Sequence, residues 1–252
     1  GEYKLMGLAP YGEPKYAELI KDHLIDIKDD GSFQLNMDYF DYCTGLAMTN
    51  DKFGNLFGGQ PRRPETELTQ REMDLASSVQ KVVEEIIIKL TKNIAEETGE
   101  KNLCLAGGVA LNCVSNGLLL REKIFENIWV QPASGDAGGA LGAALAAYHI
   151  RYKKNRVISK RDAMSGSYLG PKFRKKEVLE SLNTLGAVYT QLSENQIIEE
   201  TAKALTEGKA IGWMHGRMEF GPRALGARSI IADPRSTSMQ KQLNLKVKYR
   251  ES

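Results

Sequence analysis

The longest regular pattern of apolar positions in the chain predicts one long amphipathic helix. Apolar residues recur every three or four positions from Met73 to Ile94, as on the buried face of a helix. Thr69 and Glu72 stand three positions apart just before this run, which is the spacing of a capping box, and Gly99 ends it. We therefore expect a structural helix from about residue 70 to residue 98.

The residues before this helix follow a different pattern. Residues 28–68 are rich in Asp, Gly, Asn and Pro and contain no long periodic run. Such composition is typical of short strands joined by turns and loops.

Strand and helix patterns alternate after the long helix. An apolar strand at 103–106 leads through Gly107 and Gly108 into a helical stretch at 110–122. A second strand at 128–131 then leads into a helix of small residues at 137–149. Two such strand, glycine turn and helix units side by side favour a nucleotide-binding α/β architecture.

A second α/β unit is expected beyond residue 161. Residues 151–161 are strongly basic and poorly periodic, which favours a solvated linker over a nucleic-acid patch because no aromatic residues interleave the charges as a stacking platform. The elements predicted after it are a helix at 174–183, a strand at 188–192, a helix capped by Ser193 with Gln196 at its third position, strands at 210–214 and 229–234, and a polar helix at 237–244.

Composition indicates a folded protein with one large or two modest domains, since 42% of the 252 residues are hydrophobic and 26% are charged. The net charge of +2 gives no electrostatic argument for binding nucleic acid or an anionic membrane. Cys43, Cys104 and Cys113 lack C-x-x-C spacing, and no apolar run is long enough for a membrane span, so we expect reduced thiols and a cytoplasmic location. The chain begins at Gly1 without an initiator methionine and is expected to be a fragment.

The richest candidate chemistry lies in residues 216–229, a loop that follows the strand at 210–214. It combines Arg217, Arg223 and Arg228 with glycines and a proline. Glycines let backbone N–H groups approach a ligand, and guanidinium groups match the geometry of phosphate or carboxylate oxygens. The loop therefore predicts an anion site with an open ligand; the alternative is that the arginines are solvated or paired with surface carboxylates.

Two further segments carry weaker signals. Gly107, Gly108 and Asn112 could direct backbone and amide groups at phosphate or ribose oxygens, or could simply form a tight turn. Asp136 heads a glycine-rich helix and could be a metal ligand or an N-cap. As a ligand it would need partners, and the three histidines of the chain show no ligand spacing.

Four segments taken together resemble the NodU/CmcH O-carbamoyltransferase family, in the order in which that family has them: 2–12, 105–112, 134–138 and 216–229. The resemblance runs through essentially the whole chain. It implies an α/β fold in which residues 1–152 are the second half of an actin-like ATPase (ribonuclease H-like) domain, 153–165 are a basic linker, and 166–252 begin a YrdC-like α/β domain.

The resemblance also implies a reaction. Members of the family use ATP and carbamoyl phosphate to form a carbamoyl-adenylate, then transfer the carbamoyl group to a hydroxyl of a sugar, antibiotic or related acceptor with the help of a divalent metal, expected to be iron. Alternatives are a threonylcarbamoyl transferase that modifies tRNA, disfavoured because it would not explain the downstream arginine loop, and a nucleotide- or sugar-binding domain without catalysis. No motif names the acceptor or the oligomeric state.

The site residues follow from the same resemblance. Asp136 falls on a metal ligand, and Gly107, Gly108 and Asn112 fall on the adenosine-binding turn. The residues expected at the carbamoyl phosphate and nucleotide phosphates are Arg217, Arg223, Arg228, Ser229, Lys246, Lys248 and Arg250. The family's metal-binding histidines lie upstream of Gly1, and the chain has His215 and Ala227 where the family favours Gln and Asn. We expect the fragment alone to be inactive.

Overall fold

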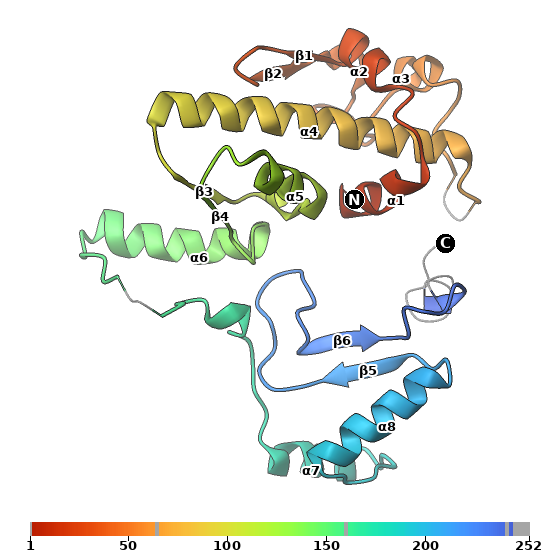
Figure 1. The fold of residues 1–252 in the computed structure, drawn as a ribbon, viewed down its shortest axis with the longest axis vertical. Helices are drawn as coiled ribbons and strands as arrows, with labels where there is room; N and C mark the ends of the chain where they lie inside the picture. The colour runs from red at the N-terminus through yellow and green to blue at the C-terminus, as the bar shows by residue number, and fades with distance from the viewer. Residues whose placement is uncertain (1, 64–65, 159–160, 240–241, 244–252) are drawn as a thin grey trace. The chain divides into compact units, whose positions relative to one another are not determined.

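The computed structural model describes residues 2–63, 66–158, 161–239 and 242–243 (Figure 1). The chain divides into two compact units between Gln131 and Pro132. No helix in the described part of the chain is both long enough and apolar enough to cross a membrane.

The first unit begins with short elements. They are α1 (Glu2–Leu8), η1 (Ala9–Tyr11), α2 (Ala17–His23), β1 (Ile25–Ile27), β2 (Phe33–Leu35), η2 (Met37–Tyr39) and α3 (Asp51–Leu56). Within residues 28–68 these elements include a short strand, as predicted, and also the short helix α3, which was not predicted. The strands β1 and β2 form an antiparallel hairpin in which Ile25 lies opposite Leu35.

Helix α4 (Gln70–Thr98) confirms the long amphipathic helix and both of its predicted ends. The amide of Thr69 donates to Glu72 Oε2 at 2.9 Å, as a capping box requires. At the other end Gly99 adopts a φ of 65°, the left-handed conformation that glycine tolerates best.

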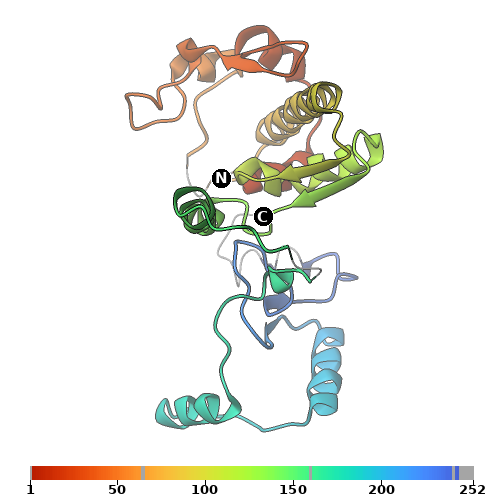
Figure 2. The ribbon, with the colours of Figure 1, turned by 90° about the vertical axis from the view of Figure 1, so that its left-hand side faces the viewer.

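Helix α4 packs between two groups of elements of the first unit (Figures 1 and 2). On one side Val82 and Ile86 join a core formed with α2, β1 and Phe57. On the other side Ile87 and Ile88 contact a cluster built on Leu119. Because both sides are covered, polar residues of α4 such as Asp74, Ser78 and Gln80 are also buried.

The alternation after α4 is confirmed as well. Strands β3 (Asn102–Leu105) and β4 (Asn127–Val130) pair in parallel, with Leu103 opposite Ile128. Helix α5 (Cys113–Glu122) connects them, but it starts three residues later than predicted because a 3-10 turn, η3 (Gly108–Leu111), precedes it.

The described residues of the second unit form helices and one small sheet. Its elements are α6 (Asp136–Ala146), the π-helical turn η4 (Ala147–Arg151), η5 (Ser165–Ser167), α7 (Lys175–Thr184), α8 (Glu194–Thr206), β5 (Ile211–Met214) and β6 (Arg228–Ile231). Ser193 caps α8 with Gln196 as its partner, as predicted. Strands β5 and β6 form an antiparallel hairpin in which Met214 lies opposite Arg228.

One predicted element is wrong. Residues 188–192 form no strand, and Val188 is fully exposed. A strand needs a paired neighbour to satisfy its backbone groups, and this segment pairs with no strand among the described residues. The predicted helix at 237–244 falls only partly within the described residues. The observed class is mixed α/β, and residues 153–158 form neither helix nor strand; the predicted domain assignments stay predictions.

Candidate functional site

The arginine loop is the connection of the β5–β6 hairpin. Arg217 and Arg228 bind backbone carbonyls of the second unit through their guanidinium groups. Arg217 Nη1 donates to the carbonyl of Gly170 at 2.7 Å. Arg228 Nη1 donates to the carbonyls of Ala227 at 2.8 Å and His215 at 3.3 Å, so this guanidinium joins the two strand ends at the base of the loop.

Glu219 holds the interior of the loop together. Its Oε1 accepts hydrogen bonds from the amides of Leu225 and Ala227, each at 2.8 Å, and of Arg228 at 3.3 Å. The residue is only 8% exposed. Burial alone would raise the pKa of Glu219, but the backbone amides, its own among them, outweigh this effect and lower the pKa from 4.5 to about 2.

The segment 167–171 fixes the first half of the loop. The amide of Phe220 donates to the carbonyl of Ser167 at 2.7 Å, and the buried Ser167 hydroxyl donates back to the carbonyl of Phe220. The amide of Gly170 donates to the carbonyl of Met218 at 2.9 Å. Tyr168 reaches the second half, where its hydroxyl donates to the carbonyl of Leu225 at 2.7 Å. The loop is therefore a built structure.

Gly221 shows why the loop needs glycine at one position. Its φ is 118°, and a Cβ there would lie 2.9 Å from the carbonyl oxygen of Pro132 and 3.1 Å from Ala133 Cα. A side chain at this position would collide with that backbone, which makes glycine necessary for the close approach.

These contacts change the predicted anion site. The amides of Leu225, Ala227 and Arg228 already bind the protein's own carboxylate, so a ligand would meet arginine side chains and not these amides. Sequence reasoning missed Glu219. Its signal was available, because it is the only acidic residue in the segment 216–229.

The other residues predicted at the phosphates are Ser229, Arg223 and three basic residues near the end of the chain. Ser229 lies in β6 opposite Trp213 and is partly buried. Arg223 is partly buried in the loop between Gly221 and Leu225. Lys246, Lys248 and Arg250 lie outside the described residues.

In the first unit, the predicted adenosine-binding turn is exposed, and Gly107 has a φ of 100°. Asn112 caps α5, since its Oδ1 accepts the amide of Ser115 at 3.1 Å. Its Nδ2 donates to Oε1 of the buried Gln80 at 2.9 Å. The side-chain amide of Asn112 is thus used structurally, while Gly107 and Gly108 are exposed.

Asp136 is the first residue of α6, where Gly135 and not Asp136 is the N-cap. Its side chain is exposed. In the described part of the chain no three His, Cys, Asp or Glu residues come together in a way that could hold a metal ion. A divalent metal therefore does not fit the residues described, because one carboxylate does not make a site.

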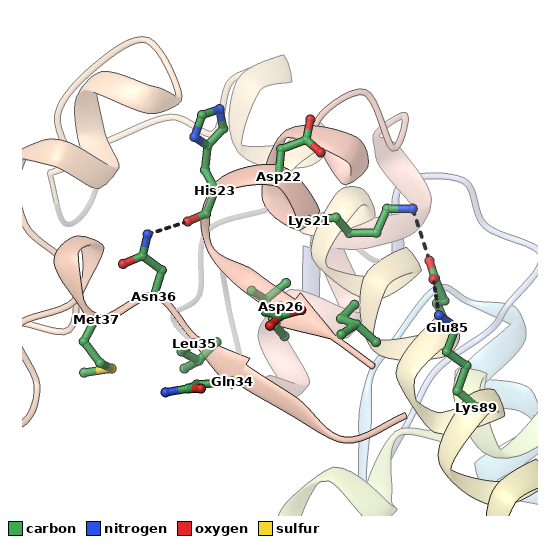
Figure 3. Close-up of a pocket in the computed structure, with 12 residues that line it drawn as sticks. Lys21, Asp22, His23, Asp26, Gln34, Leu35, Asn36, Met37, Glu85 and Lys89 are labelled. Carbon is green, nitrogen blue, oxygen red and sulfur yellow. Dashed lines mark hydrogen bonds and ion pairs between the residues drawn. The ribbon is translucent and has the colours of Figure 1, made fainter. Parts of the chain in front are cut away.

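A cavity of about 720 Å³ lies elsewhere in the first unit, between the β1–β2 hairpin, α2 and α4 (Figure 3). Glu85 bridges two lysines in its wall, at 3.3 Å from Lys21 and 3.5 Å from Lys89. Asn36 donates to the carbonyl of His23 at 3.0 Å. The cavity contains none of the predicted site residues.

Comparison with protein families gives two matches. The family described as Carbamoyltransferase N-terminus matches residues 1–145. The family described as Carbamoyltransferase C-terminus matches residues 202–252, which include the whole arginine loop.

Individual relatives agree with these matches. An uncharacterized protein of Synechocystis is 59% identical over the whole chain, which covers 41% of that protein. Nodulation protein NolO of Bradyrhizobium diazoefficiens is 39% identical over the whole chain, and the match covers 43% of NolO. Nodulation protein NolNO of Sinorhizobium fredii is 37% identical over 99% of the chain, and the match covers 35% of NolNO. The chain thus spans less than half the length of each of these relatives.

Proposed function

Because this chain belongs to the carbamoyltransferase family, in its NodU/CmcH branch, we propose that the whole protein uses carbamoyl phosphate, water and ATP to form a carbamoyl-adenylate, with release of phosphate and pyrophosphate. The carbamoyl group is then transferred to a hydroxyl of a small-molecule acceptor, and AMP leaves. One observation carries the proposal: the N-terminal and C-terminal carbamoyltransferase families match the chain in order, and the second match holds the arginine loop. The actin-like and YrdC-like assignments, and the domain limits 1–152 and 166–252, belong to the same proposal.

In this proposal the arginine loop binds the phosphate of carbamoyl phosphate. A phosphate group carries a concentrated negative charge, and fixed guanidinium groups stabilise such charge without having to reorganise during the reaction. Arg217 and Arg228 support the loop through the carbonyls that they bind. Arg223, which lies inside the loop between Gly221 and Leu225, is assigned to the phosphate of the donor. A cationic site of this kind needs no protein nucleophile.

The exposed turn at Gly107 and Gly108 is the proposed adenosine contact. Its backbone lies at a helix start, where the first amide groups have no partner within the helix. We assign Asn112 a supporting role there, because its side chain caps α5 and pairs with Gln80. Ser229, Lys246, Lys248 and Arg250 keep their proposed role at the phosphates.

The metal has the weakest support. A divalent ion bound near the acceptor would polarise the carbamoyl carbonyl. Asp136 could supply one ligand, and the other ligands would have to come from residues outside those described. The cytoplasmic location also stays a prediction.

A product assay with the full-length protein tests the proposal. The protein is incubated with ATP, carbamoyl phosphate and a panel of sugar, antibiotic and related hydroxyl acceptors, and products are read by mass. We expect an acceptor carbamate that requires both ATP and carbamoyl phosphate. Carbamoylated tRNA nucleosides in place of an acceptor carbamate would favour the threonylcarbamoyl alternative, and nucleotide or sugar binding without any product would favour a binding domain.

A further inference from the structure

Arg223 lies in a short segment that the protein holds at both ends. At the start, Phe220 exchanges backbone and hydroxyl hydrogen bonds with Ser167, and Gly221 packs against the backbone at Pro132. At the end, the amide of Leu225 donates to Glu219 at 2.8 Å. The residues between these two points have little freedom to move Arg223.

The contact that holds the end of this segment is made by the charged carboxylate of Glu219. One oxygen of a buried carboxylate accepts three amides, two of them at 2.8 Å. Hydrogen bonds to an ionised acceptor are roughly twice as strong as those between neutral groups. In the described part of the chain Glu219 forms no ion pair, so backbone amides hold it and the carboxylate in turn orders the backbone.

A glutamine at this position would be a poor substitute. If glutamine placed its oxygen at the position of Glu219 Oε1, this neutral oxygen would accept the hydrogen bonds more weakly. If it placed its NH2 group there, that group would face the backbone N–H groups of Leu225 and Ala227, and donor would meet donor. The contacts between Phe220 and Ser167 would survive, so the change would release only the second half of the loop.

From this arrangement we propose that Glu219 is the positioning residue of the carbamoyl phosphate site: by binding the amides of Leu225 and Ala227, it fixes Arg223 where its guanidinium meets the phosphate of the donor. The inference rests on the proposed function. Glu219 itself does not contact the ligand, because its carboxylate would repel a phosphate and is already occupied by amides.

The experiment compares the full-length protein with its Glu219→Gln variant. Amide hydrogen exchange reports whether Leu225 and Ala227 are protected, and steady-state kinetics report KM for carbamoyl phosphate and for the acceptor separately. Glu207→Gln is the matched control, since Glu207 is an exposed carboxylate of the same unit that pairs with Lys209. It should change neither measurement.

For Glu219→Gln we expect loss of protection at both amides and an increase of about tenfold to 100-fold in KM for carbamoyl phosphate, with the acceptor KM unchanged. A general loss of structure would raise both KM values together. If this variant does not fold, exchange in the wild-type protein still decides, because unprotected amides at Leu225 and Ala227 would overturn the inference.

Two failures can be told apart. If the wild-type protein does not use carbamoyl phosphate, the proposed function is wrong, whatever the exchange shows. If the wild-type protein is active and Glu219→Gln matches it in KM, the positioning role is wrong and the proposed function stands.

Discussion

Asn112 offers a direct test of how the predicted adenosine-binding turn is built. We consider Asn112→Ala, which removes two interactions of one side chain. The first is the cap of α5 through the amide of Ser115 at 3.1 Å. The second is the reciprocal pair of hydrogen bonds with Gln80, in which Asn112 Nδ2 donates at 2.9 Å and Gln80 Nε2 donates back to Asn112 Oδ1 at 3.3 Å. Both partners are buried, with Ser115 1% exposed and Gln80 6% exposed.

The magnitude follows from these two losses. Removing an Asn cap costs about 1 kcal/mol, and losing a hydrogen bond to a buried amide costs about 1 kcal/mol more. We expect Asn112→Ala to lower the free energy of unfolding of the first unit by about 2 kcal/mol. Asn112→Asp should cost less than half of that, because its carboxylate keeps the cap and suits the positive end of the helix.

The assay is urea unfolding of the chain followed by the fluorescence of Trp129, which lies in β4 of the first unit. Trp213→Phe in all variants removes the signal of the second unit. Asn102→Ala is the matched control, since Asn102 is an exposed asparagine of β3, and it should stay within about 0.5 kcal/mol of the parent.

A change of less than about 0.5 kcal/mol for Asn112→Ala would refute the capping role. The Asp variant then separates structure from binding. If it is stable and the full-length protein carrying it still binds ATP normally, Asn112 serves the helix; if ATP affinity falls while stability holds, Asn112 contacts the nucleotide.

Three further predictions concern other parts of the chain. Arg223→Ala in the full-length protein should weaken carbamoyl phosphate binding measured by calorimetry more than acceptor binding, and an unchanged donor affinity would exclude its assigned role. Gly138→Ala should destabilise the second unit in urea, because the added Cβ would lie 1.9 Å from a backbone oxygen, whereas Gly139→Ala, with open space around it, should be neutral or stabilise by up to about 1 kcal/mol. The pKa of Asp74 is held at about 2, chiefly by the amide of Glu13; this stabilisation is present above about pH 4 and lost as the pH falls toward 2, so Asp74→Asn should flatten the acid side of a stability-against-pH curve.

The sequence predicted best where local signals decide the structure. Helix α4 begins after Thr69 and ends at Gly99 as expected, because a capping box and a left-handed glycine act within a few residues of the chain. The start of α5 could have been placed correctly by the same logic, since Asn112 precedes Ser115 by the spacing of a cap.

The failures have a tertiary cause. Residues 188–192 have strand-forming side chains, but a strand forms only against an available edge. In the arginine loop, the contact between Ser167 and Phe220 joins residues 53 positions apart, which no local pattern indicates. The arginines and glycines of the sequence marked residues 216–229 as a candidate site. The hydrogen bonds of the Glu219 carboxylate to backbone amides arise only when the loop has folded back on itself, so the sequence did not reveal them.

The most direct test of the central claim follows the carbamoyl group itself. The full-length protein is given carbamoyl phosphate with a labelled carbonyl carbon, a hydroxyl acceptor, and either ATP or no nucleotide. We expect label in the acceptor only when ATP is present, with release of pyrophosphate, and a strong reduction of that label in Arg223→Ala. An acceptor that stays unlabelled across the panel while the protein is folded and binds ATP would contradict it.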